Sequence, residues 1–201
     1  FNIPSGSMIP TLLVGDYLFV SKFSYGYSKH SLPLSMPLIP DRVWYSEPKR
    51  GDVAVFKLPT DNKTDYIKRI IGLPGDKIQM KKGRLFINGE IVKRERTDDF
   101  IQTDSFGNLK RTLRYIETLP NGKVHTILEQ QGDDGQLDNT GVYEVPAEHF
   151  FAMGDNRDNS SDSREWGTVS EKDIVGRAIA VWMHKEPGLN LPSFARNQRI
   201  K

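Results

Sequence analysis

Short apolar runs separated by polar turns dominate this chain, and the pattern predicts strands rather than helices. The runs are rich in β-branched and aromatic residues and are bounded by Gly, Asp or Pro, as is typical of short buried strands. The clearest runs are residues 15–20, 51–58, 65–72 and 176–183. Helical periodicity is scarce. One short helical turn is expected over residues 170–176, where Ser170 is placed to cap it.

Two Asn-Gly pairs stand between apolar runs, and each predicts a β-hairpin because both residues tolerate the backbone angles of a tight turn. The pairs are Asn88-Gly89 and Asn121-Gly122. Both fall in a part of the chain that is otherwise polar and full of charged turns. The hairpins therefore belong to a region that differs in composition from the rest.

This difference in composition predicts two domains. Residues 1–76 and 146–185 hold the densest apolar strands, whereas residues 77–145 are polar and rich in hairpin signals. We therefore expect a mainly β fold with few short helices. Its β-rich core domain, built from several antiparallel sheets, comprises residues 1–76 and 146–201, and residues 77–145 form an inserted second β domain.

Composition and charge narrow the class of protein. With 201 residues, of which 37% are hydrophobic and 27% charged, the chain can bury a sizeable core. The net charge is +2 without a sustained basic block, so nucleic acid is not an expected partner. Cysteine is absent, which excludes disulfides and thiolate zinc sites. No apolar run reaches the roughly 18 residues of a membrane span, but the chain begins at Phe1, so we expect an upstream segment.

Two further segments have a distinctive composition. Residues 26–50 contain four prolines and are expected to form an ordered loop. The tail, residues 186–201, mixes Leu and Phe with Arg and Lys. Such a mixture suits a membrane interface, and it suits equally a tail that packs on its own domain.

A stretch with two serines, PSGSMIPT, opens the chain at residues 4–11. It is either a loop that tolerates serine or a place where Ser5 or Ser7 reacts. No histidine lies nearby, since the first in the chain is His30. A serine hydroxyl attacks a carbonyl only when a base takes its proton, so a reactive serine here needs a base from elsewhere in the fold.

Lysine occupies an unusual place in the run DYIKRIIG, residues 65–72. With a period of two, Tyr66, Lys68 and Ile70 share one face of the strand. One explanation is an edge strand whose lysine extends to solvent. The other is a buried lysine that serves as a general base. An ordinary lysine is neutral only about once in a thousand near pH ~7.4, but burial lowers its pKa by several units.

A third group of polar residues, GDNRDNSSDSREWG, spans residues 154–167. A calcium loop is a poor match, because Arg157 stands where a ligand is needed and the expected Gly and Glu are missing. A solvated turn explains the composition, but not why Met153 and two phenylalanines lead directly into it. We therefore favour a cross-linked Asp/Arg/Ser turn that supports a site.

Taken together, the chain resembles the bacterial type I signal peptidases, the membrane-anchored serine endopeptidases that remove signal peptides from exported proteins. Four blocks carry the resemblance: PSGSMIPTL (4–12), GDYLFVSKF (15–23), KRGDVAVFKLP…DYIKRIIGLPGD (49–76) and MGDNRDNSSDSREWG (153–167). They stand in the family's order and leave residues 77–145 as the variable second domain. Some relatives carry a disulfide and extra length in that domain, which this chain lacks.

The resemblance implies a Ser–Lys dyad that works through an acyl-enzyme, with Ser7 as nucleophile and Lys68 as general base. It implies that the Ser5 hydroxyl joins the Ser7 backbone N–H in an oxyanion hole, and that Ser160 holds Lys68 by a hydrogen bond. Tyr66 lies beside the lysine in the family. The matches to the family's structural ion pairs are Arg69, Asp155, Asp162 and Arg164.

The resemblance also implies the substrate and its surroundings. Small apolar pockets would accept Ala-x-Ala before the cut, lined by Phe1, Ile3, Met8, Leu12, Leu18, Val55 and Ile67. The partners would be signal peptides of exported preproteins and the lipid surface. We expect a monomer without metal or other cofactor, on the outer, periplasmic face of the cytoplasmic (inner) membrane.

Two other classes of protein remain open on the sequence. A self-cleaving repressor-type domain uses the same Ser–Lys chemistry in cis, but the chain shows neither the Ala-Gly or Cys-Gly bond to be cut nor a DNA-binding partner domain. A non-catalytic β-rich periplasmic binding module would leave the serine, lysine and Ser–Asp–Arg blocks unexplained. Such a module would not be labelled covalently at Ser7.

Overall fold

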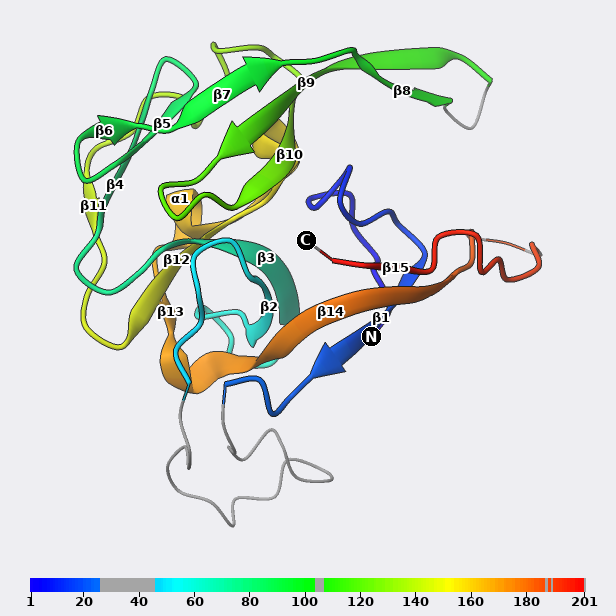
Figure 1. The fold of residues 1–201 in the computed structure, drawn as a ribbon, viewed down its shortest axis with the longest axis horizontal. Coiled ribbons are helices and arrows are strands. Elements are labelled where there is room, and N and C mark those ends of the chain that lie inside the picture. Colours follow the sequence, from blue (N-terminus) through cyan, green and yellow to red (C-terminus); the bar gives the residue numbers. More distant parts are fainter. Residues whose placement is uncertain (26–45, 104–106, 187, 189, 201) are drawn as a thin grey trace.

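The computed structural model describes residues 1–25, 46–103, 107–186, 188 and 190–200. Most of the expected loop at residues 26–50 therefore lies outside the described residues. Antiparallel pairing joins the strands into three sheets, one of seven strands and two of four (Figure 1). The expected mainly β fold with several antiparallel sheets is confirmed.

The largest sheet has the strand order β1-β14-β2-β3-β12-β13, and β15 pairs with β14. β3 therefore lies between two neighbours inside the sheet, because β2 and β12 both pair with it. All four runs expected from the sequence are in this sheet. Its strands are β1 (Asp16–Ser21), β2 (Val53–Lys57), β3 (Asp65–Gly72), β12 (His149–Met153), β13 (Val169–Ser170), β14 (Ile174–His184) and β15 (Gln198–Arg199).

The other two sheets are built from strands that all fall within residues 77–145. One has the order β11-β4-β5-β6, from β4 (Lys77–Lys81), β5 (Arg84–Ile87), β6 (Glu90–Ile91) and β11 (Tyr143–Glu144). The second joins β7 (Lys93–Arg96), β8 (Phe100–Thr103), β9 (Leu109–Thr118) and β10 (Val124–Glu129). These sheets lie above the largest sheet in Figure 1. The division into two domains stays a prediction.

Both hairpins form, with different loops. Asn88 and Gly89 connect β5 and β6 directly, with φ angles of 54° and 83° that suit a two-residue turn. The β9–β10 loop is longer, because the last pair of the ladder joins Thr118 to Val124. In it Gly122 has a φ of 80° and donates a backbone hydrogen bond to Leu119.

Helices are few and short, as expected. The turn η4 (Glu171–Asp173) begins where the sequence indicates, and the Ser170 side chain caps it by accepting a hydrogen bond from Lys172 N. Two further turns were not foreseen, η3 (Arg157–Asn159) and α1 (Ser163–Trp166). Asp162 caps α1. Across the described ranges, none of the helices has the length and apolar character to cross a bilayer.

Strand β3 reaches all three clusters of buried apolar side chains. Ile67 belongs to the cluster with Met8 and Leu12, whereas Ile70 and Ile71 belong to the two others. Successive side chains of a strand point to opposite faces, so a strand covered on both faces is apolar on both. The middle of β3 is therefore a dry environment on either side of the sheet.

The tail packs on the core in part, and its expected suitability for a membrane interface stays a prediction. β15 pairs with β14, and Arg196 forms a bidentate ion pair with the buried Asp16, at 3.0 and 2.9 Å. The tail therefore packs on its own domain. Leu191 and Phe194 nevertheless remain 88% and 61% exposed.

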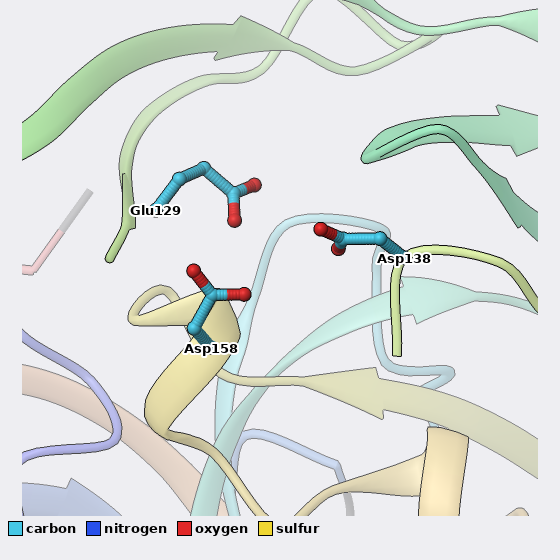
Figure 2. Close-up of side chains that lie close together, drawn as sticks. All are labelled: Glu129, Asp138 and Asp158. Atoms are coloured by element: carbon cyan, nitrogen blue, oxygen red, sulfur yellow. The ribbon is translucent and has the colours of Figure 1, made fainter. Parts of the chain in front are cut away.

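The end of β10 meets the 154–167 turn. Leu128 N donates a hydrogen bond to Asp155 O at 2.8 Å, in a short parallel bridge between the two segments. One residue later, the Glu129 carboxylate faces those of Asp138 and Asp158 (Figure 2). The insertion and the turn are thus joined through backbone and side chains together.

Candidate active site

Ser7 lies in a compact turn that the 154–167 segment holds from one side. Ile9 N donates to Gly6 O, which closes the turn after the serine. Asn156 donates twice, from its backbone N to Ser7 O and from its side chain to Gly6 O, both at 3.0 Å. Ser7 is buried. Residues about 150 positions apart in the sequence therefore hold the backbone at Ser7 in place.

Lys68 extends from β3 to this serine. Its Nζ lies 2.8 Å from Ser7 Oγ in a hydrogen bond and donates a second hydrogen bond to the Ile67 carbonyl at 3.1 Å. Only 3% of Lys68 is exposed, and β3 is an interior strand. The alternative of an edge-strand lysine reaching solvent is therefore wrong. The fold brings together two residues that stand 61 positions apart in sequence.

Burial lowers the pKa of Lys68 from its ordinary 10.5 to about 8. The nearby carboxylates of Asp162 and Asp155 oppose this shift, because they favour the ammonium, and Arg164 adds to it. The Tyr66 ring covers the amine, with its centroid 5.0 Å from Nζ. A substantial fraction of neutral amine at neutral pH is what proton abstraction from a serine requires.

Two hydrogen-bond donors stand beside the Ser7 hydroxyl. Ser5 Oγ lies 3.5 Å from Ser7 Oγ. The Ser7 backbone N–H has no partner among the hydrogen bonds of the described residues. Together they form a pair of donors that a developing oxyanion can use.

A cleft of about 360 Å³ opens at the dyad, lined by Ser5, Ser7, Tyr66, Lys68 and their neighbours. Of the seven residues expected to line substrate pockets, Ile67 lines this cleft. Phe1 is 43% exposed. The remaining five are buried in the apolar cluster that Ile67 also joins: Ile3, Met8, Leu12, Leu18 and Val55. Their contact with substrate stays a prediction.

Arg69, the residue after the lysine, points to the other face of β3 and forms the expected pair with Asp155. Its Nε and one terminal nitrogen reach the two carboxylate oxygens at 2.9 and 2.8 Å. Both side chains are 1% exposed. Burial alone would raise the pKa of Asp155, but Arg69 holds it below its ordinary value. Thr11, on the serine segment, donates to the same carboxylate.

Asp162 and Arg164 form the second expected pair, with two contacts of 2.9 Å. The Asp162 carboxylate also accepts hydrogen bonds from Gly154 N and from Ser160 Oγ, at 2.9 and 2.8 Å. Burial would raise the pKa of Asp162, but Arg164 and these donors lower it. The turn at residues 154–167 is cross-linked, as favoured from its sequence.

Ser160 differs from expectation in one contact. Its hydroxyl proton goes to Asp162, and the two hydrogen bonds of the Lys68 amine within the described chain go to Ser7 and Ile67. The expected Ser160–Lys68 hydrogen bond is therefore not formed here. Because the Ser160 hydroxyl donates its single proton to the Asp162 carboxylate, it could meet the lysine only as an acceptor, and the two hydrogen bonds of the amine go to Ser7 and Ile67 instead.

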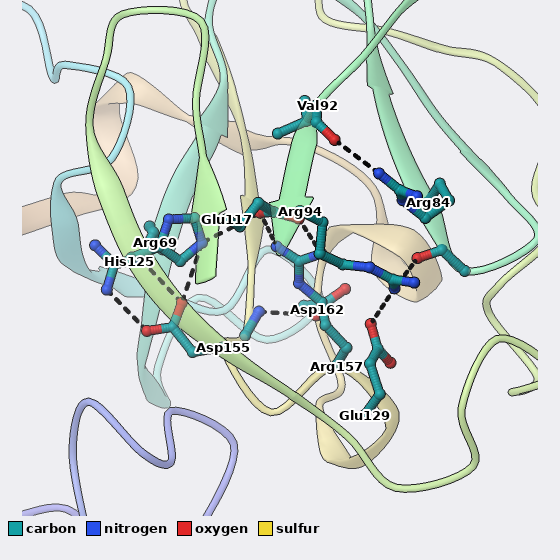
Figure 3. Close-up of polar contacts among 12 residues, drawn as sticks. Arg69, Arg84, Val92, Arg94, Glu117, His125, Glu129, Asp155, Arg157 and Asp162 are labelled. Atoms are coloured by element: carbon teal, nitrogen blue, oxygen red, sulfur yellow. Dashed lines mark hydrogen bonds and ion pairs between the residues drawn. The ribbon is translucent and has the colours of Figure 1, made fainter. Parts of the chain in front are cut away.

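A buried charged cluster that the sequence did not reveal extends this network into the insertion (Figure 3). Arg157 makes a bidentate ion pair with Glu117 of β9, and His125 Nε2 lies 3.2 Å from Glu117 and 3.9 Å from Asp155. Burial lowers the pKa of His125, as does the charge of Arg69. The only signal in the sequence was a Glu and a His at positions where strands otherwise carry apolar residues.

Comparisons with known proteins agree on one family. The model of the family described as signal peptidase, peptidase S26, matches residues 1–183. Signal peptidase I of Pseudomonas fluorescens is 42% identical over 215 residues, covering 100% of this chain and 71% of the relative. That of Rickettsia typhi is 41% identical over 190 residues, covering 90% and 70%. A crystal structure of a signal peptidase I from Enterococcus faecalis has a TM-score of 0.38 at 23% identity, covering 66% of this chain and 97% of that one.

The substitution Asp162→Asn should destabilise the protein strongly, because it leaves the buried Arg164 guanidinium without its counter-charge. We expect a loss of roughly 3–5 kcal/mol in the free energy of unfolding. Glu144→Gln removes a partner of the exposed Lys77 and should cost no more than about 1 kcal/mol. Urea denaturation of both variants measures the difference. Equal losses would contradict a structural role for the Asp162–Arg164 pair.

Proposed function

Because this chain belongs to the signal peptidase family, peptidase S26, we propose that it cleaves signal peptides from exported preproteins as a serine endopeptidase with a Ser7–Lys68 dyad. The observation that carries the proposal is the 2.8 Å contact between Lys68 Nζ and Ser7 Oγ, with the lysine pKa lowered to about 8. A neutral amine at that distance is placed to accept the hydroxyl proton.

The first half of the reaction forms an acyl-enzyme. Ser7 Oγ attacks the carbonyl carbon of the scissile bond while its proton moves to Lys68 Nζ. The tetrahedral oxyanion is stabilised by the Ser7 backbone N–H and the Ser5 hydroxyl. The amide C–N bond then breaks, and the Lys68 ammonium gives its proton to the leaving amine.

The second half regenerates the enzyme. Lys68, neutral again, takes a proton from a water molecule that attacks the ester carbonyl, and the same two donors stabilise the second oxyanion. Collapse of that intermediate breaks the ester bond to Ser7, which recovers its proton from the lysine. Throughout, Tyr66 covers the amine and the Asp162–Arg164 and Arg69–Asp155 pairs brace the surrounding backbone.

The proposed cleavage site follows an Ala-x-Ala pattern. The cleft beside Ser7 is lined in part by Ile67 and Pro4, and Ile67 also packs in the buried apolar cluster. Small side chains suit such a shallow apolar surface, whereas larger ones would need the buried side chains of the cluster to move. The substrate would therefore present alanine to the pockets before the cut.

A lipid surface is the second partner that we propose, with the domain acting as a monomer on the outer face of the cytoplasmic membrane. Trp182 of β14 contacts three aromatic rings, those of Tyr17, Phe19 and Phe194. Phe19 and Phe194 are 55% and 61% exposed. Exposed aromatic side chains beside basic residues of the tail favour the interface between water and lipid.

Removal of either dyad member should abolish cleavage of a peptide that carries Ala-x-Ala, while the protein stays folded. Ser7→Ala deletes the nucleophile, and Lys68→Ala deletes the base. Ser5→Ala removes one oxyanion donor and should lower kcat by a hundred-fold or more, as an order of magnitude. Lys77→Ala, which alters an exposed lysine, is the matched control. Cleavage is followed by mass spectrometry of the products.

Near-normal cleavage by Lys68→Ala would contradict the dyad. A β-lactam-like active-site reagent distinguishes a serine peptidase from the remaining alternative, a non-catalytic binding module. We expect covalent labelling of Ser7 in the parent protein and none in Ser7→Ala. A non-catalytic binding module would be labelled in neither.

Cleavage should rise with pH through the pKa of Lys68. Below about pH 8 the amine is mostly protonated, so kcat/KM should increase about tenfold per pH unit at acid pH and level off above pH 9 or so.

The free energy of unfolding should rise with pH between about pH 8 and 10.5, because there the unfolded chain binds the proton and the folded one does not. Lys68→Met should abolish this contribution. A kcat/KM independent of pH between 6 and 9, as a rough range, would contradict the assignment.

The exposed aromatic residues should determine how strongly the protein binds lipid vesicles. Phe194→Ser removes an apolar side chain from the proposed contact and should weaken vesicle binding by about tenfold. Leu109→Ser, at an exposed position on β9, is the matched control and should leave binding unchanged. Co-sedimentation with vesicles of bacterial lipids measures both. Equal binding by the two variants would place the lipid contact elsewhere.

A further inference from the structure

Three carboxylates converge where the insertion meets the 154–167 turn, apart from the serine and lysine. Glu129 ends β10, Asp138 lies in the loop that follows, and Asp158 belongs to η3. An oxygen of each lies within 4.8 Å of an oxygen of the others. Figure 2 shows the three side chains pointing toward a common space. Three like charges at this spacing repel one another unless a positive charge or protons join them.

Glu129 and Asp138 are both 0% exposed. In the described part of the chain, neither carboxylate oxygen of Glu129 has a hydrogen-bond partner, nor has Asp138 Oδ1. A buried carboxylate without hydrogen-bond donors is costly, because it has lost its water. The ion pair that Glu129 forms with Arg94, at 3.6 Å, is too long for a hydrogen bond, so these oxygens can take a further partner.

The nearby arginines are already engaged. Arg94 binds both oxygens of Asp133, at 2.8 and 3.1 Å, and stands 3.6 Å from Glu129. Arg157 is committed to Glu117 (Figure 3). Arg164, which pairs with Asp162, also acts on Asp138, so three guanidinium groups stand among six carboxylates in this region. The balance of charge favours an additional cation.

The local backbone leaves room for the three carboxylates to approach one another. A Cβ at Gly135 would lie 2.4 Å from Asp158 Oδ1 and 3.0 Å from Asp138 Oδ2, so only glycine fits. Backbone N–H groups of Gln130 and Gln131 hold Asp158 Oδ2 at 2.6 and 2.7 Å, which fixes this carboxylate. Of the three acidic residues, Asp158 lines a cavity of about 260 Å³, together with Gln131 and Gln136.

From this geometry we infer that Glu129, Asp138 and Asp158 bind a hard divalent cation, Ca²⁺ foremost, which ties the 130–138 loop to the turn behind the dyad. All the ligand atoms are oxygens, which Ca²⁺ and Mg²⁺ prefer. Ca²⁺–oxygen distances of about 2.3–2.6 Å place opposite ligands about 5 Å apart, a spacing that the cluster accommodates. Water and backbone carbonyls would complete the shell.

This site differs from the calcium loop considered and rejected on sequence, and it departs from the expectation of no metal. The rejected calcium loop would take all its ligands from residues 154–167, whereas this cluster takes one ligand from each of three segments. The alternative to a cation is a proton. Burial raises the pKa of Glu129 to about 8, so without a metal this carboxyl would be largely neutral at pH 7. A bound cation and a protonated Glu129 therefore differ in whether the cluster takes up metal ions.

The test is calorimetric titration of the EDTA-treated protein with CaCl₂ and, separately, with MgCl₂. We expect saturable one-to-one binding of Ca²⁺ that is weakened at least about tenfold in Glu129→Gln and in Asp158→Asn. Asp134→Asn, an exposed carboxylate of the same loop, is the matched control and should bind as the parent does. Circular dichroism establishes that each variant is folded.

Thermal unfolding provides a second measurement. At a Ca²⁺ concentration about a hundred times the Kd, Tm should rise by roughly 5–10 °C in the parent and in Asp134→Asn. The rise should vanish in Glu129→Gln. Absence of saturable binding of either ion by the parent, or a Ca²⁺-dependent Tm that Glu129→Gln retains, would overturn the proposal. Binding of Mg²⁺ alone would overturn the choice of Ca²⁺. None of these results depends on cleavage activity.

Discussion

The amine of Lys68 is held out of water inside a strand and within 2.8 Å of the Ser7 hydroxyl. Burial of an amine is unfavourable, since it forces the group toward its neutral form, which is the form that the proposed general base requires. The sheet sustains the cost because β3 has neighbours on both edges and apolar clusters on both faces. A looser strand would admit water, restore the ordinary pKa of the lysine and leave the serine without a base.

The 154–167 turn keeps the serine in place against this strand. Asn156 holds the backbone of Ser7, while Asp155 and Asp162 each receive a bidentate arginine, Arg69 from β3 and Arg164 from α1. Their negative charges also keep the Lys68 pKa from falling further. The same carboxylates therefore brace the geometry and tune the base, so their removal would disturb position and protonation together.

The strands of residues 77–145 are connected to the turn through charge as well as through the chain. Glu117 and His125, on β9 and β10, contact the Arg157 and Asp155 side chains of the turn. Glu129 is the last residue of β10, and its carboxylate lies close to those of Asp138 and Asp158. Asp158 stands two residues before Ser160, so a cation at that cluster would act on the backbone of the turn rather than on the reacting atoms. Loops can thereby influence a rigid site that they do not enter.

The sequence by itself determined the mainly β fold, the four runs of the largest sheet and both hairpins, because these follow from local periodicity and turn chemistry. Its resemblance to the signal peptidases implied the roles of Ser7 and Lys68. The sequence also indicated a cross-linked turn, since Met153 and two phenylalanines lead directly into that polar segment. Only the tertiary structure decided that Lys68 is interior rather than at an edge, because strand order is a property of the sheet. It likewise decided that Ser160 donates to Asp162, and that Glu117, His125, Glu129 and Asp138 are buried. Strand order and the Glu117–Arg157 pair involve residues dozens of positions apart, where one-dimensional patterns carry no information on distance.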